Sequence, residues 1–513
     1  MGSATLLSMA RDLEIDMRIL GDIRAFLENR DYGRAAALAE KTLASGFEHP
    51  LLLFALAMGL ERDDKPEDAL RLLERAVILS PGDAVVRNAV SLCLQRLDRP
   101  AEALRNIDEL LEKRPDLGFA HATRGNARIY MGWPTPAKRS HLRALELEPG
   151  NLVALAALSS LATQRGEHED ARRWAETARQ ASPGHPQALM SLAVAELAND
   201  AVKPAETLLQ EIILGDHAAP VEKARAMGLL GDVLQAQGRY DDAFDAYTTG
   251  NEVLRTIYHR LARRKGALAQ VRALIASVSS IDVAEAQSRP EASAEPAGLR
   301  GHVFVLDFPG SANTPLETAL ARHPRVSTID EHAVPGDEGG AAPPLRTAYW
   351  EAVRDMGIET AGKMLVDRHP LNILQLPVIA RLFPHAKIVF VCRDPRQTVL
   401  DCFRYGFSKN VELYDLLTLT GAAVFYEAAM RFIDRAGPRT GLEWHVLRSE
   451  SLHSDFKRES RRMFDFLGLK PVAETSDPQG PGQTTGSWTH YEARLHPILP
   501  AIKLWVTSLG YRL

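Results

Sequence analysis

The clearest chemical signal in this sequence follows a short apolar run, HVFVLDF, at residues 302–308. The loop after it consists of Pro309, Gly310, Ser311, Ala312, Asn313 and Thr314, and PLETALARHP is predicted to form the next helix. Pro315 suits the first position of a helix, and the residue before it can cap that helix. A strand, loop and helix in this order direct backbone N–H groups and a positive helix dipole at one point, which favours a phosphate. The Walker A pattern GxxxxGK[ST] does not occur here, so a kinase or NTPase is not indicated.

A second polar cluster follows the apolar run AKIVFVC, which ends at Cys392. Arg393, Asp394 and Arg396 come next, at the predicted C-terminal edge of a strand. Ligands bind at that edge in open α/β sheets. Two further strands are predicted in GKMLVDR and EWHVLRSESL, with helical stretches between them, which indicates a parallel sheet.

A repeat of 34 residues precedes this α/β region. Prolines recur in steps of 34 from Pro81 to Pro183, and alanines recur in the same steps from Ala69 to Ala205. This is the length of the tetratricopeptide repeat (TPR), a pair of helices that stacks on its neighbours. About seven units are predicted between residues 16 and 257, and LRTIYHRLARRKGALAQVRALI is expected to cap the stack. Such arrays bind a peptide or another protein in their groove, and a spacer or dimerisation arm is the alternative.

Composition and charge narrow the class of protein. The formal net charge is −5 and no long run of like charges occurs, so binding to nucleic acid is not expected. No apolar run approaches the roughly 20 residues that span a bilayer. Three cysteines without CxxC spacing and the lack of a secretory signal predict a cytoplasmic protein, and no metal site is expected. We expect an all-α TPR solenoid at 1–278, a linker at 279–300 rich in Ala, Ser, Glu and Pro, and an α/β domain at 301–513.

The order of motifs in the α/β region resembles a known family. The chain carries PGSANT, ARHP, Glu331, VDRHPLN, RLFPHAKI, CRDPR, FDFLGL and GSWTHYE. The family carries PRSGTT, a helix ending in HP, a Glu, D-K-x-P-x-N, RLFP-x-A-K-I, RDPR, DF-x-GL and GRWRHYE in the same order. This is the sulfotransferase domain of the bacterial TPR–sulfotransferase proteins, which is similar to the protein-tyrosine sulfotransferases, and the resemblance covers residues 300–495.

The resemblance implies a P-loop-like parallel sheet and transfer of a sulfuryl group from 3′-phosphoadenosine 5′-phosphosulfate (PAPS) to a hydroxyl or amine. By position, the loop from Pro309 to Thr314 would hold the 5′-phosphosulfate, and Arg393 would hold the 3′-phosphate. Glu331, in the polar loop STIDEHAVPGDEGG, stands where the family has its general base. Arg368 stands where a lysine assists the leaving group, and Trp488 lies in the tail that closes over the nucleotide.

Several positions depart from the family pattern. Gly310 replaces an arginine of the phosphosulfate loop, and Ser487 replaces an arginine of the tail. Asp401 stands where the family has a serine beside the 3′-phosphate, and a carboxylate repels a phosphate unless a cation intervenes. Lys363, Arg396 and Arg404 are candidates to compensate for the lost cations.

Two functions therefore stay open at the level of sequence. The first is a PAPS-dependent sulfotransferase acting on a protein or peptide, tyrosine being one possible acceptor, that the TPR arm presents. The second is a TPR scaffold whose sulfotransferase fold has lost catalysis and mediates protein–protein interaction. Intact fold elements suit both functions, whereas the altered phosphate contacts favour the second.

Overall fold

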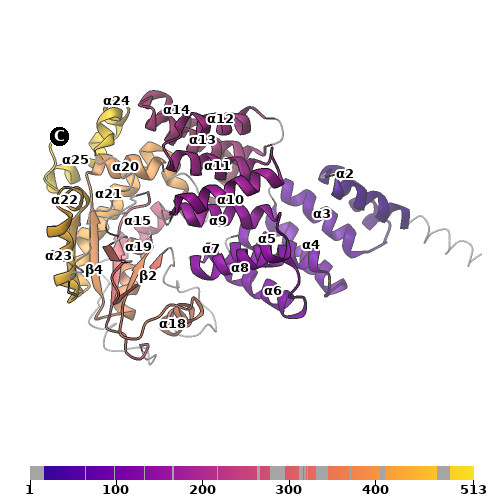
Figure 1. The fold of residues 1–513 in the computed structure, drawn as a ribbon, viewed down its shortest axis with the longest axis horizontal. Coiled ribbons are helices and arrows are strands. Elements are labelled where there is room, and N and C mark those ends of the chain that lie inside the picture. Colours follow the sequence, from indigo (N-terminus) through magenta and orange to yellow (C-terminus); the bar gives the residue numbers. More distant parts are fainter. Residues whose placement is uncertain are drawn as a thin grey trace, which may run out of the picture. The chain divides into compact units, whose positions relative to one another are not determined.

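A computed structural model describes most of the chain. The described residues are 17–29, 31–63, 65–97, 99–131, 133–164, 167–215, 218–262, 266–277, 295–310, 316, 319–320, 322–330, 345–369, 371–404, 411–470 and 486–513. The chain divides into two compact units, Met1–Met131 with Ala137–Ala154, and Gly132–Pro136 with Leu155–Leu513. The first unit is helical, and the second contains helices followed by a parallel sheet (Figure 1).

The N-terminal half consists of helices, and successive helices pair from α2 to α7 and again from α10 to α14. They are α2 (Tyr32–Ala44), α3 (Pro50–Arg62), α4 (Pro66–Leu79), α5 (Ala84–Arg96), α6 (Pro100–Lys113), α7 (Gly118–Tyr130), α8 (Pro134–Leu147), α9 (Leu152–Gln164), α10 (His168–Ala181), α11 (Pro186–Ala198), α12 (Val202–Leu214), α13 (Pro220–Ala236), α14 (Tyr240–Ala262) and α15 (Ala267–Ser277). The predicted TPR solenoid is confirmed. The alanines of the 34-residue period, from Ala69 to Ala205, are fully buried, because small side chains let paired helices approach closely.

The buried alanine of each repeat leaves no room for a larger side chain. We expect Ala103→Leu, in α6, to destabilise the first unit by about 1–3 kcal/mol, because added methylenes force neighbouring side chains apart. The measurement is the thermal unfolding midpoint of the purified chain. Ala101→Leu adds the same side chain at an exposed position of α6 and serves as the control. Equal midpoints for the two variants would contradict the predicted packing.

The C-terminal half is built on five parallel strands. They are β1 (Gly301–Leu306), β2 (Val326–Asp330), β3 (Met364–Arg368), β4 (Lys387–Cys392) and β5 (Glu443–Arg448), in the order β2-β3-β1-β4-β5. The other elements are α18 (Leu345–Asp355), α19 (Asn372–Leu382), α20 (Pro395–Arg404), η2 (Val411–Leu417), α21 (Leu419–Ala436), η3 (Gly437–Arg439), α22 (Ser449–Ser454), α23 (Phe456–Leu467), η4 (Ser487–Tyr491), α24 (Glu492–Leu495), η5 (His496–Ile498) and α25 (Leu499–Ser508). The predicted α/β class with a parallel sheet is confirmed.

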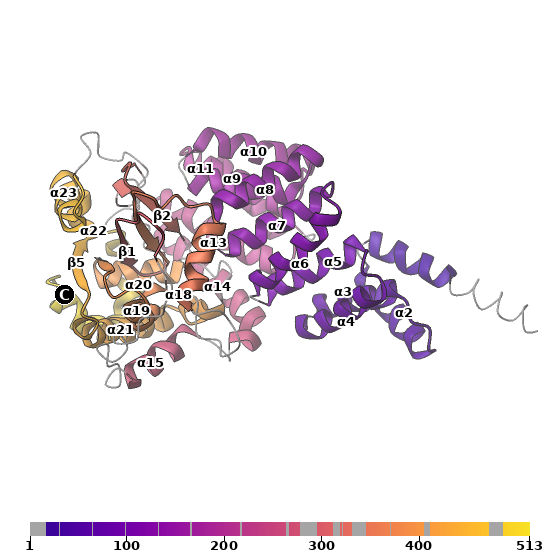
Figure 2. The same ribbon diagram turned by 90° about the horizontal axis from the view of Figure 1, so that it is seen from below.

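Helices cover both faces of this sheet (Figure 2). On one face, Val303, Val389 and Leu447 pack in an apolar cluster with Met463 and Phe464 of α23. On the other face, strand residues contact α18 and α19. For example, the centroid of the Phe304 ring lies 5.4 Å from that of Phe383, the residue that follows α19. A sheet buried on both faces explains why its inner strands read as continuous apolar runs.

Strand β2 was not predicted from the sequence. Four of its residues, Ser327 to Asp330, belong to the segment STIDEHAVPGDEGG that was interpreted as a polar loop, but Val326 to Asp330 pair in parallel with β3. The strand lies at the edge of the sheet. An edge strand needs fewer apolar residues than an inner one, which explains why the hydrophobic pattern missed it.

The predicted capping helix is divided in two. Leu254 to Ala262 continue α14, the second helix of the last repeat, and α15 is a separate helix. Helix α15 packs on α21 and η2, and its Leu268 N–H donates to Asp415 Oδ2 at 3.2 Å. Helix α15 therefore contacts the α/β region. None of the helices in the described ranges is both long and apolar enough to cross a membrane.

Candidate functional site

The topology of the sheet marks one place for a ligand. The chain leaves β1 toward β2 on one side of the sheet and leaves β4 toward β5 on the other. Where neighbouring strands send their connections in opposite directions, a crevice opens at their C-terminal ends, and ligands bind there. Pro309, which follows β1, and the segment from Arg393 to Arg404 after β4 therefore lie at this edge.

The start of the loop after β1 is held against helix α20. Pro309 is buried, and its carbonyl oxygen accepts a hydrogen bond from Cys402 Sγ at 3.2 Å. Gly310 has a φ of +80°, a region that glycine adopts without strain and other residues avoid. The arginine that the related family places here would be strained in this backbone. Ser311, Ala312, Asn313 and Thr314 lie outside the described residues.

Arg393 and Asp401 form a buried ion pair. Arg393 Nη1 donates to Asp401 Oδ2 at 2.7 Å, and the two side chains are 5% and 2% exposed. Burial raises the pKa of the Asp401 carboxyl, and the charges of Arg393 and Arg404 oppose that rise. The arginine that the resemblance assigns to a 3′-phosphate is thus paired with a carboxylate of its own chain.

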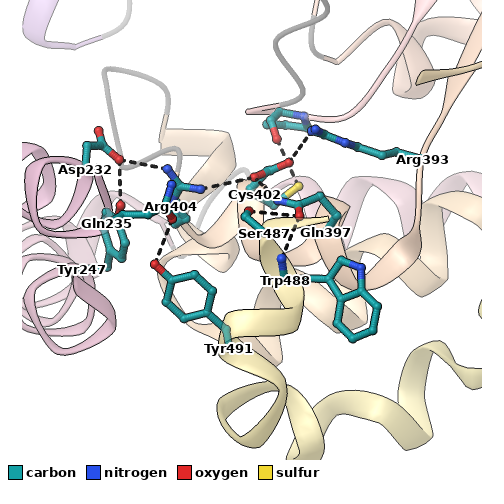
Figure 3. A network of polar contacts seen from close by, with 12 residues as sticks. Asp232, Gln235, Tyr247, Arg393, Gln397, Cys402, Arg404, Ser487, Trp488 and Tyr491 are labelled. Atoms are coloured by element: carbon teal, nitrogen blue, oxygen red, sulfur yellow. Dashed lines mark hydrogen bonds and ion pairs between the residues drawn. The ribbon is translucent and has the colours of Figure 1, made fainter. Parts of the chain in front are cut away.

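Gln397 connects this ion pair to the C-terminal tail (Figure 3). Its Nε2 donates to Asp401 Oδ1 at 2.9 Å. Its Oε1 accepts from Ser487 Oγ at 3.1 Å and from the Trp488 N–H at 2.9 Å. The serine that replaces a tail arginine therefore serves as a structural donor. Sequence reasoning missed Gln397, although its spacing of four residues from Asp401 places both on one helix face.

Arg396 is committed to a second ion pair. Its Nε and Nη2 donate to the two carboxylate oxygens of Asp394 at 3.0 and 2.7 Å, and both side chains are buried. The guanidinium also lies 3.6 Å from the centroid of the Trp488 ring, a close cation–π contact. Trp488 is thus used to cover Arg396, and Arg396 is not a spare cation for a ligand.

Arg404 links the α/β region to the last repeat. Its Nη2 donates to Asp232 Oδ1 of α13 at 3.1 Å, and its Nη1 lies 3.7 Å from Asp401 Oδ1 (Figure 3). Asp232 also accepts a hydrogen bond from the Tyr247 hydroxyl of α14 at 2.7 Å. Asp232 precedes Arg404 by 172 residues, so no local pattern in the sequence relates the two.

Arg368 ends strand β3, beside β1 and away from the cluster on α20. Its backbone pairs in register with Val305 of β1 and Asp330 of β2. Glu331, the predicted base, follows Asp330 and lies outside the described residues. Arg368 is partly exposed, which is compatible with contact to a ligand.

A buried polar network surrounds Asp367, the residue that precedes Arg368 in β3. The Tyr349 hydroxyl donates to Asp367 Oδ2 at 2.9 Å, and Asn372 Nδ2 donates to Asp367 Oδ1 at 3.1 Å. His302 Nε2 lies 2.9 Å from the Tyr349 oxygen and supplies the proton of that bond, because the tyrosine proton is given to Asp367. His302 Nδ1 is buried without a hydrogen-bond partner in the described part of the chain.

This network predicts loss of stability in acid. Burial, together with the charge of Arg346, lowers the pKa of His302 to about 3, because protonation would charge the buried Nδ1. The unfolded chain binds this proton near pH 6.5, so stability falls as the pH drops from 6.5 toward 3, by up to about 1.4 kcal/mol per pH unit. Urea unfolding of the natural chain and His302→Phe at pH 7 and pH 5 measures this effect. The stability difference between them should shift by about 2 kcal/mol in favour of the variant at pH 5. A difference independent of pH would exclude His302 as its source.

The structure brings together part of the predicted site. Pro309, Arg393, Asp401 and Trp488 gather around α20, whereas Arg368 lies at the end of β3, with β1 between it and β4. Within the described ranges, no group of His, Cys, Asp and Glu is arranged to hold a metal ion. The three arginines at α20, Arg393, Arg396 and Arg404, each form an ion pair with a carboxylate of the chain.

Comparison with known proteins agrees with the two halves of the chain. A family model described as "Sulfotransferase family" matches residues 311–474, and one described as "Tetratricopeptide repeat" matches residues 21–84 and 157–221. A search of curated proteins found no match.

Similar solved structures include PilW, a type IV pilus biogenesis factor, with 17% identity and a TM-score of 0.33, covering 39% of this chain and 91% of PilW. A tetratricopeptide repeat protein from Parabacteroides merdae has 17% identity and a TM-score of 0.36, covering 46% of this chain and 92% of its own. A thermophilic TPR protein from Thermus thermophilus has 17% identity and a TM-score of 0.30, covering 38% and 98%. By the family models, this chain joins tetratricopeptide repeats to a domain of the sulfotransferase family.

Proposed function

We propose that this protein is a TPR scaffold for protein–protein interaction whose sulfotransferase-family domain does not use PAPS. Tetratricopeptide repeats generally mediate binding to other proteins, and the repeat model matches residues 21–84 and 157–221 of this chain. The observation that carries the proposal is the buried ion pair between Arg393 and Asp401, at 2.7 Å. Asp401 stands where the family has a serine beside the 3′-phosphate, and its carboxylate pairs with the arginine that the resemblance assigns to that phosphate.

The energetics of this ion pair oppose nucleotide binding. A 3′-phosphate would have to take Arg393 from Asp401 and leave that carboxylate buried beside a second anion. Two like unit charges 4 Å apart repel by about 4 kcal/mol at an effective dielectric constant of about 20. Breaking a buried ion pair by removing one partner costs about 3–5 kcal/mol. Either cost exceeds what one added phosphate contact returns, at about 1.5–3 kcal/mol.

The rest of the described site supports the same conclusion. Gly310 and Ser487 replace two arginines of the family pattern, and Ser487 donates to Gln397. Arg396 is paired with Asp394, and Arg404 with Asp232. The residues present therefore do not fit PAPS, and we derive no reaction step through it.

Calorimetric titration with 3′-phosphoadenosine 5′-phosphate (PAP), the nucleotide product of sulfuryl transfer, tests the proposal. We expect neither heat of binding nor a shift of the thermal midpoint at millimolar PAP. A micromolar dissociation constant that Arg393→Ala abolishes would contradict the proposal and would support a functional nucleotide site.

One observation favours a second function, PAPS-dependent sulfuryl transfer to a protein or peptide presented by the repeats. Arg368 is partly exposed at the C-terminal edge of β3, where the family has its leaving-group lysine. In this function, Glu331 would be the base. Incubation with ³⁵S-labelled PAPS and tyrosine-containing peptides measures it. Incorporation by the natural chain that Arg368→Ala removes would establish the second function in place of the first.

A further inference from the structure

Four charged side chains form a chain of alternating sign that crosses from the α/β region to the last repeat (Figure 3). Arg393 contacts Asp401 at 2.7 Å, Asp401 lies 3.7 Å from Arg404, and Arg404 contacts Asp232 at 3.1 Å. Two cations and two anions leave no net charge in this chain. A neutral cluster attracts an oxyanion much less than the same arginines would if one carboxylate were lost.

The position of Asp232 is determined by packing within the repeat. Tyr247 lies so close to Gly231 that a Cβ added to that glycine would come within 2.4 Å of the ring. The buried tyrosine then donates its hydroxyl proton to Asp232 at 2.7 Å. The Arg404 guanidinium also lies 5.3 Å from the Tyr247 ring, a cation–π contact that adds to the ion pair.

Other contacts keep α20 and the repeat in register. Asn251 Nδ2 of α14 donates to the Phe403 carbonyl oxygen, in the last turn of α20, at 3.0 Å. The Tyr491 hydroxyl donates to Gln235 Oε1 of α13 at 2.8 Å. The distance between Asp232 and the site around Arg393 is therefore set on both sides, by α20 and by the tail.

We infer that Asp232 of the last repeat is a positioning residue that suppresses oxyanion binding at Arg393. Asp232 holds Arg404 3.7 Å from Asp401. The shorter contact of Asp401, at 2.7 Å, is therefore the one with Arg393. Without the charge of Asp232, Arg404 turns to Asp401, and Arg393 is released toward the crevice between β1 and β4. This inference rests on the proposed function, because it explains how the repeats keep the transferase-like site closed to phosphate.

The test compares Asp232→Asn with the natural full-length chain by titration with PAP, and with sulfate as the probe for an oxyanion alone. Asparagine keeps the shape and the acceptor for Tyr247, so only the charge changes. One added net positive charge should tighten the binding of PAP on the order of tenfold or more at low ionic strength. An Asp232→Asn chain that binds PAP no more tightly than the natural chain, including no heat from either chain at millimolar PAP, would overturn the inference.

Two control variants separate a local effect from a change in total charge. Asp245→Asn also removes one carboxylate near the repeat boundary, but Asp245 contacts Arg494 at 3.1 Å and not Arg404. It should leave PAP binding unchanged, and an equal gain in Asp245→Asn would refute the role of Asp232. The double variant Asp232→Asn with Arg404→Gln should lose the gain, because the net charge returns to zero.

The outcomes also separate this inference from the proposed function. Micromolar PAP binding by the natural chain would refute the proposed function, and the ratio between Asp232→Asn and the natural chain would still decide the inference. Asp232→Asn combined with Asp401→Ser gives a second measurement, compared with Asp401→Ser alone. Because Asp232 acts on Arg393 through Asp401, Asp232→Asn should bring no further gain in that background, and a further gain of tenfold would show a direct effect of charge and overturn the positioning role.

Discussion

An Asp401→Ser variant is expected to unfold about 3–5 kcal/mol more readily than the natural chain in buffer without multivalent anions, and to recover stability when PAP is added. The serine leaves the Arg393 guanidinium buried without its carboxylate, which is the costly way to break a buried pair. It also restores the residue type that the related family has at this position. A dianionic phosphate then supplies the missing counter-charge.

The recovery has a defined size. A ligand that binds only the folded state adds about 2.7 kcal/mol of stability at a concentration 100 times its dissociation constant. A PAP dissociation constant of about 10 μM would therefore recover most of the loss at about 1 mM PAP. The natural chain should show no such dependence, because Asp401 already occupies Arg393.

Thermal and urea unfolding with and without PAP measure both parts of this prediction. Asp401→Leu combined with Arg393→Met is the matched control, because replacing a whole buried pair by apolar residues is close to neutral and leaves no cation for PAP. An Asp401→Ser chain that is as stable as the natural chain, and indifferent to PAP, would show that the ion pair is not what closes the site.

The second large effect concerns the repeats. A shortened chain of residues 301–513, which begins where the sequence places the α/β domain, is expected to lack a cooperative unfolding transition. It loses α14 and α15, which pack on η2 and α21, and α13, whose Asp232 pairs with Arg404 of α20. The Phe403 and Tyr491 rings would lose Phe244, whose ring centroid lies 5.3 and 6.2 Å from theirs. Arg404 would also lose its ion pair with Asp232.

A longer chain provides the comparison. Residues 186–513 begin at α11 and keep two repeat pairs with every contact named above. That chain should unfold cooperatively, because it keeps all three residues of the buried apolar cluster of Ala224, Leu254 and Leu417. Circular dichroism and size-exclusion chromatography of both chains measure the difference. A cooperative, monomeric 301–513 chain would contradict the prediction and would support the domain boundary at residues 279–300.

Much of the fold could be predicted from the sequence because it follows from local periodicity. The 34-residue spacing of alanines such as Ala103 determines which residues lie between paired helices. The runs HVFVL and KIVFVC form inner strands, which need apolar residues on both faces. Strand β2 was not predicted because it lies at the edge of the sheet. There, polar residues such as Ser327 and Thr328 can pair with β3 without an apolar run.

The candidate site could be predicted in part. The residues Arg393 and Asp401 were both identified, and the family resemblance, which implies a serine at position 401, already suggested a conflict between a carboxylate and a phosphate. What the sequence could not show is that the two side chains are buried and pair with each other at 2.7 Å. Side-chain direction at the end of a strand and along α20 depends on what packs over it, here the tail at Trp488.

By itself, the sequence determined the repeat architecture, the parallel sheet and the residue types at the edge of that sheet, because these follow from the spacing of apolar and small residues. The tertiary structure alone decided the electrostatic state of the site. Arg404 and Asp232 meet across 172 residues, and only the packing of the last repeat on α20 brings them to 3.1 Å. Charges interact through distance in space, which no spacing along the chain records.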